Sequence, residues 1–99
     1  MLPDPHVWVF NAARATFPGG VFTTRARAEA WIAKHQLSGT LTAYPIDMSV
    51  MDWGYEVGAF APGKFDNKMD NARFVGGFSS GVQEHYHYEN GTQGHSIDP

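Results

Sequence analysis

Residues 83–91, QEHYHYENG, alternate strictly between two sets of side chains. The odd-numbered positions carry an amide, two imidazoles and a carboxylate: Gln83, His85, His87 and Glu89. The even-numbered positions include two phenols, Tyr86 and Tyr88. Successive side chains of a β-strand point to opposite faces of its sheet. The stretch therefore predicts a strand with imidazoles on one face and phenols on the other. We expect the phenols to pack on a helix-covered face. In a flipped sheet the phenols would instead be exposed and the imidazoles would lie on the covered face.

The rest of the chain predicts further strands and helices around this segment. β-Branched and aromatic residues between turn signals predict strands at 6–11, 21–23, 40–44, 73–79 and 82–89. Apolar residues at helical spacing after a capping residue predict helices at 25–36 and 49–57. The order ββαβαββ, with hairpins at both ends, predicts an α+β fold: a mainly antiparallel sheet of about five strands with two helices on one face. The other face would then meet solvent or a partner.

The length of 99 residues predicts one domain, with a core at about 6–91. Pro, Gly, Asn and Asp dominate residues 61–71, which predicts a flexible loop. Residues 92–99 are polar and predict a frayed tail. Three tryptophans fall in three predicted elements and are expected to share one core: Trp8, Trp31 and Trp53.

The composition excludes several classes of protein. The chain has no cysteine, which excludes a disulfide scaffold and a thiolate-rich zinc site. Its formal charge is −3 and its 7 Lys and Arg residues are scattered, so no nucleic-acid partner is expected. The N-terminus shows no signal-peptide pattern, and no apolar run approaches the roughly 18–20 residues of a membrane span. We therefore expect a cytoplasmic protein without a membrane partner.

Two groups of polar side chains are candidates for partner contact. The first lies on the alternating strand and comprises His85, His87 and Glu89. The second surrounds the helix predicted at 49–57 and comprises Asp47, Asp52 and Glu56. Such carboxylates could pair with basic groups of a partner protein. The alternative for both groups is simple solvation.

The histidine pair also raises the question of a metal site. At i, i+2 on a strand, the Cβ atoms of His85 and His87 lie about 6.5–7 Å apart, so both rings could reach one ion. Glu89 extends the row, and His6 or His95 could join it. No HExxH motif or cysteine ligand supports a metal centre, so no cofactor is expected. No GxSxG nucleophile elbow surrounds any serine, so no catalytic residue is assigned.

Several segments together resemble a small bacterial family with a domain of unknown function. They are HVWVFN at 6–11, FPGGVFTT at 17–24, AEAWIAKHQLSGTLTAYPID at 28–47, DW at 52–53 and FVGGFSSGVQEHYHYENG at 74–91. The resemblance implies no particular reaction. Small single-domain bacterial proteins of this kind often neutralise toxins by binding them, which is an analogy of class.

We therefore predict a small non-enzymatic protein-binding domain. Its favoured form is an immunity or inhibitor protein that neutralises a toxin or another enzyme by occlusion and electrostatic complementarity. One alternative is a metal-binding protein, in one version hydrolytic, that uses His85 and His87. Another is a structural homo-oligomer, for example a homodimer formed through the edge of the sheet.

Overall fold

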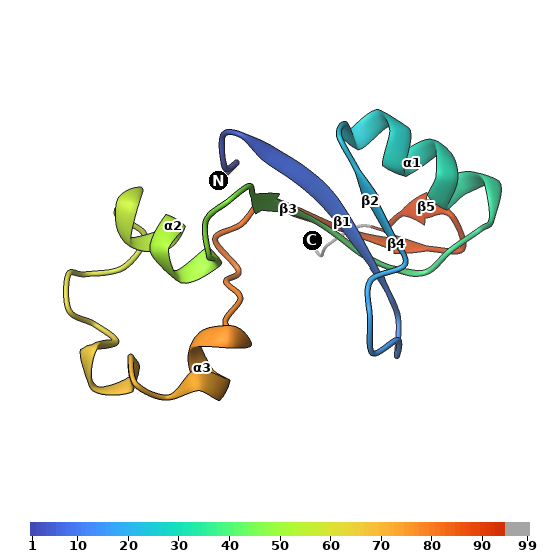
Figure 1. Cartoon of the computed structure of the whole chain (residues 1–99). Helices are drawn as coiled ribbons and strands as arrows, with labels where there is room; N and C mark the ends of the chain where they lie inside the picture. The colour runs from blue at the N-terminus through green and yellow to red at the C-terminus, as the bar shows by residue number, and fades with distance from the viewer. Residues whose placement is uncertain (95–99) are drawn as a thin grey trace.

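A computed structural model describes residues 1–94 and contains one five-stranded sheet (Figure 1). The strands are β1 (His6–Ala12), β2 (Gly20–Phe22), β3 (Gly39–Pro45), β4 (His85–Glu89) and β5 (Thr92–Gln93). Their order in the sheet is β2-β1-β3-β4-β5, and every neighbouring pair is antiparallel. The prediction of an α+β fold with an antiparallel sheet of five strands is thus confirmed.

Each α-helix starts where a side-chain oxygen accepts a hydrogen bond from a backbone amide of the first turn. The helices are α1 (Arg25–Lys34), α2 (Val50–Glu56) and α3 (Ala72–Gly76), with one turn of 3-10 helix, η1 (Asp66–Lys68). Their capping residues are Thr24, Ser49 and Asn71. Such caps satisfy amides that have no partner inside the helix. The sequence predicts a capping residue before each of the first two helices and none before the third.

The predicted strand at 73–79 is wrong, because this segment forms α3 and the turn after it. The Asn71 Oδ1 accepts a hydrogen bond from the Phe74 amide at 3.0 Å, which favours a helical start. The rings of Phe74 and Phe78 then pack against each other, with centroids 5.7 Å apart. The order is therefore ββαβααββ, with η1 inside the predicted 61–71 loop.

The fifth strand of the sheet comes from the predicted tail instead. Asn90 and Gly91 have φ angles of 51° and 87°, as in a two-residue type I′ turn. This turn joins Glu89 to Thr92, which are paired in register. Residues 92–93 thus belong to the sheet, and the predicted frayed tail is wrong there. Residues 95–99 lie outside the described part of the chain.

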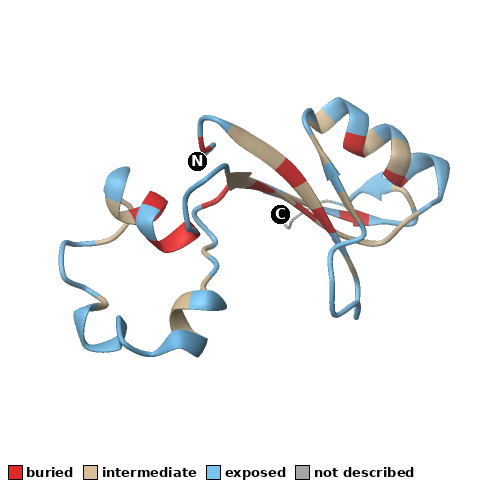
Figure 2. Ribbon diagram, viewed as in Figure 1, coloured by how far each residue is buried: buried red, intermediate tan, exposed pale blue. Residues whose placement is uncertain are grey.

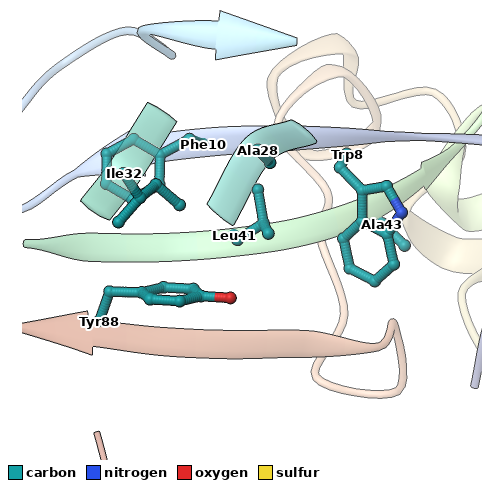
Figure 3. Close-up of a cluster of buried hydrophobic side chains, with 7 residues drawn as sticks. All are labelled: Trp8, Phe10, Ala28, Ile32, Leu41, Ala43 and Tyr88. Carbon is teal, nitrogen blue, oxygen red and sulfur yellow. The ribbon is translucent and has the colours of Figure 1, made fainter. Parts of the chain in front are cut away.

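One face of the sheet packs against α1 and forms the main core, which we call the sheet core (Figures 2 and 3). It consists of Trp8, Phe10, Ala28, Ile32, Leu41, Ala43 and Tyr88. α2 contributes no residue to it, and Figure 1 shows α2 and α3 beyond the end of the sheet. The prediction of two helices on one face is therefore wrong for α2. The radius of gyration, 14.6 Å, exceeds the roughly 13 Å of a compact chain of this length.

A second group of apolar side chains lies outside the sheet, and we call it the aromatic cluster. It consists of Tyr55, Phe60, Phe65, Phe74 and Phe78, with neighbouring ring centroids 5.2–6.1 Å apart. Trp53 is buried at 3% exposure but is not part of the sheet core, whereas Trp31 packs against that core. The expectation of one core around three tryptophans is therefore wrong for Trp53.

Candidate binding surface

The sheet face opposite α1 carries a continuous set of polar and small apolar side chains, which we call the open face. It comprises Val9, Asn11, Thr40, Thr42, His85, His87 and Glu89, and the register places Val7, Val21 and Tyr44 on the same side of the sheet at its margin. The register pairs Thr42 with both Val9 and His85, and it pairs Thr40 with both Asn11 and His87. None of the seven side chains is buried, so the open face is accessible across three strands.

The two imidazoles of the open face lie side by side. The ring centroids of His85 and His87 are 5.3 Å apart and the rings are nearly perpendicular, at 85°. The His85 Nδ1 lies 2.7 Å from the Gln83 carbonyl oxygen. Because a carbonyl oxygen only accepts hydrogen bonds, Nδ1 carries the proton, and Nε2 of the neutral ring keeps its lone pair. The His87 Nδ1 lies 3.3 Å from the Thr40 Oγ1.

Gln83 anchors the backbone that holds His85. Its side chain is 1% exposed, and its Nε2 donates a hydrogen bond to the Ala43 carbonyl at 3.0 Å. Its Oε1 accepts from the Ser80 amide at 3.0 Å. The predicted strand at 82–89 therefore starts only at His85, and Gln83 is a buried link between β3 and the preceding loop rather than a surface residue.

The phenols lie on the opposite face, as the alternation predicts. Tyr88 is 6% exposed under α1, and its hydroxyl donates a hydrogen bond to the Glu29 Oε2 at 2.6 Å. Burial, followed by this hydrogen bond, raises the pKa of Tyr88 well above its ordinary value. The Arg25 guanidinium lies 3.5 Å above the ring of Tyr86. The phenols thus stabilise the contact between sheet and helix.

The acidic group lies on a different part of the molecule. Asp47 lies between β3 and α2, and Asp52 and Glu56 lie on α2; all three are exposed. The Asp52 amide donates to the capping Ser49 Oγ at 3.0 Å. In Figure 1, α2 lies beyond the end of β3, whereas β4 runs within the sheet. The two predicted contact groups are therefore separate surfaces.

The histidine pair gains no third metal ligand within the described residues. No group of three or more His, Asp or Glu side chains in residues 1–94 is placed to hold an ion. His6 lies against Trp8, with ring centroids 5.7 Å apart, on the α1 side of the sheet. His95 lies outside the described part of the chain. Residues 1–94 thus supply two imidazoles to any ion at this site.

Two hollows flank the pair. One, of about 230 Å³, is lined by Thr40, Thr42, Tyr44, Ser79, Ser80, Gly81, Gln83 and His85. The other, of about 560 Å³, lies toward Asn11, Ser38 and Glu89. The Ser80 Oγ accepts a hydrogen bond from the Val82 amide at 3.1 Å, and no hydrogen bond within residues 1–94 joins a serine to His85. The nucleophile–base contact typical of covalent catalysis is not formed among these residues.

A comparison with protein families found a match, which spans nearly the same residues as the described fold. A family model for a domain of unknown function, DUF7710, matches residues 7–94. The chain belongs to this family. The match spans the open face and the aromatic cluster, and it covers the described fold except residues 1–6. No curated protein and no solved structure matches the chain. The resemblance to a small family with a domain of unknown function is thereby confirmed.

Sequence reasoning missed two features of this DUF7710 chain. The first is that Thr40 and Thr42 lie directly beside the imidazoles. The alternation of residues 40–44 already indicated that these two threonines share one face of their strand. The aromatic cluster had a weaker signal, because its rings come from segments that were predicted as loop and strand. No helix of residues 1–94 combines the length and apolarity needed to cross a bilayer.

Proposed function

We propose that this DUF7710 chain is a non-enzymatic protein-binding domain and that the open face is its contact surface. The observation that carries the proposal is the accessible row formed by β1, β3 and β4, in which none of seven side chains is buried. The row offers hydroxyls, an amide, imidazoles and a carboxylate as hydrogen-bonding groups, together with one valine. Protein interfaces combine polar and apolar area in this way.

The shape and charge of the open face favour a protein partner with a basic surface. Small-molecule sites are concave and bury most of their ligand, whereas the open face extends across three strands and has hollows only at its flanks. The seven residues include Glu89 and no Lys or Arg, and the chain carries a formal charge of −3. Complementary charge would accelerate association and select against acidic partners.

The narrower proposal is that the partner is a toxin or another enzyme and that binding occludes it. It rests on the analogy with small bacterial immunity and inhibitor proteins, as does a cytoplasmic location. The exposed carboxylates of Asp47, Asp52 and Glu56 support it as a second contact with basic active-site groups. Occlusion requires only steric fit and complementary charge.

Affinity capture from a bacterial host tests the proposal. The bait is the full chain, with buffers containing a chelator so that bound metal plays no part. The face variant carries His85→Ala, His87→Ala and Glu89→Ala. The control variant carries three substitutions of exposed residues at the other side of the molecule: Arg27→Ala, Lys34→Ala and His35→Ala.

We expect the wild type and the control variant to recover the same protein, and the face variant to lose it. Titration of the purified partner should then show at least about a tenfold weaker Kd for the face variant, or about 1.4 kcal/mol. Circular dichroism verifies that both variants are folded. Equal recovery by all three baits, or substrate turnover by the purified chain, would reject the proposal.

A further inference from the structure

We infer that His85 and His87 form half of a zinc site and that the same pair of a second copy supplies the other half. This inference rests on the geometry of the pair and is independent of the proposed partner protein. Zinc stands here for the divalent ions that prefer imidazole ligands, which include copper and nickel.

The His85 ring is held in the tautomer that a metal requires. Its Nδ1–H donates to the Gln83 carbonyl oxygen at 2.7 Å, and Gln83 is itself fixed by its buried side chain. Metal-ligating histidines almost always donate the other ring N–H to a carboxylate, backbone carbonyl or water, which orients the ring. The His85 side chain is exposed, and the lone pair of its Nε2 is therefore available to a metal ion.

The His87 ring supplies a second ligand to the same ion. His87 can donate its Nδ1–H to the Thr40 hydroxyl oxygen, 3.3 Å away. The lone pair of its Nε2 is then also available to a metal ion. Zn–N distances of about 2.0–2.1 Å and tetrahedral geometry require two nitrogens about 3.3 Å apart. With ring centroids 5.3 Å apart on two exposed side chains, rotation of the rings can bring the two Nε2 atoms to that separation.

Ligand count and charge point to a second copy of the chain. Structural zinc takes four ligands, and residues 1–94 supply two at this place. A twofold axis through the ion would bring two identical pairs together, which is the commonest symmetry of homo-oligomers. The open face carries no Lys or Arg that would repel the ion, and each chain has a formal charge of −3. A divalent cation would therefore reduce the repulsion between two acidic copies.

Sedimentation velocity of the full chain, purified without a His tag and freed of metal, tests the inference. We expect a monomer in chelator and a dimer on addition of zinc chloride, reversed by EDTA. Calorimetric titration should give one zinc for two chains. His85→Ala, His87→Ala and the double variant should remain monomeric in zinc, and His35→Ala, which removes another exposed imidazole, should dimerise as the wild type does.

Three outcomes would overturn the inference. The first is a wild-type mass that zinc does not change. The second is one zinc bound per monomeric chain, because the remaining ligands would then not come from a second copy. The third is zinc-dependent dimerisation of the double variant, which would place the site elsewhere. Since both histidines are exposed, His85→Gln with His87→Gln provides a folded, polar version of the same test.

Discussion

At the scale of single residues, Glu29 is the polar residue that joins the sheet to α1. Its Oε2 accepts hydrogen bonds from the Tyr88 hydroxyl at 2.6 Å and from the Arg25 Nε at 3.2 Å. The ion pair is partly exposed, with side chains 34% and 37% accessible, so solvent screens most of its energy. The bond from the buried phenol is therefore the stronger of the two contacts, because less solvent reaches it than reaches the exposed ion pair.

Tyr88→Phe should lower the free energy of unfolding by about 1.5 kcal/mol, since it removes one hydrogen bond to a carboxylate and keeps the packed ring. Urea denaturation measures the effect. Tyr44→Phe is the matched control, because Tyr44 forms no side-chain hydrogen bond within residues 1–94 and is only half-buried. Equal loss in both variants would show that the contact with Glu29 does not stabilise the fold.

Stability should also depend on alkaline pH through Tyr88. Burial and the Glu29 carboxylate raise its pKa in the folded chain above the ordinary value of 10.0, so the folded state holds the proton more tightly than the unfolded chain. This contribution is complete below about pH 10 and is lost as the pH rises further. The free energy of unfolding should therefore fall more steeply above pH 10 in the wild type than in Tyr88→Phe. Parallel curves would contradict this assignment.

At the scale of elements, α2 contains a glycine where a helix ordinarily disfavours one. A Cβ added at Gly54 would lie 2.1 Å from the Phe60 Cε2, so the ring occupies the space that a side chain would need. Phe60 in turn packs against Tyr55, Phe65 and Phe78. The glycine thus weakens the helix locally and permits the aromatic cluster to close against it.

Gly54→Ala should destabilise the chain by about 1–3 kcal/mol, because overpacking against Phe60 outweighs the roughly 1 kcal/mol gain in helix propensity. Gly76→Ala, at the end of α3, is the control: nothing lies within 4 Å of the added Cβ. It should leave stability unchanged or raise it by up to about 1 kcal/mol. Thermal unfolding compares the two, and a stabilising Gly54→Ala would disprove the close packing.

At the scale of the whole molecule, the sheet core and the aromatic cluster of residues 1–94 differ in how far they are buried. The sheet core is fully buried between α1 and three strands, whereas every ring of the aromatic cluster is partly exposed. The molecule is accordingly elongated, with extents of 43 × 28 × 25 Å. Local stability follows burial and contact density, so the two parts should open with different free energies.

Hydrogen exchange should separate these two parts. Amides of β1 and β3 should exchange slowest, because seven register pairs join these two central strands to each other and each has another strand on its other side. Amides of residues 58–78 should exchange faster, since this segment contains only short helices and turns. Exchange followed by mass spectrometry measures this difference. Uniform protection across both regions would show that the chain opens as one cooperative unit.

Features that depend on neighbouring residues could be predicted from the amino-acid sequence. Alternation in residues 83–91 separated imidazoles from phenols, and capping residues marked the starts of the helices predicted at 25–36 and 49–57. Asn90–Gly91 also carried a local hairpin signal, which the interpretation of a polar tail overlooked. Strand parity and capping arise from backbone geometry over a few residues, and this is why the sequence shows them directly.

Contacts between distant segments determine where the aromatic residues of 72–78 pack. Their β-forming composition predicted a strand, but strand preference depends on packing against neighbours, and here the neighbours are Phe60 and Phe65 rather than the sheet. The same holds for the open face, because the sequence cannot state which face α1 covers or that α2 lies beyond the sheet. Burial is a property of distant contacts, and only the folded chain brings those contacts together.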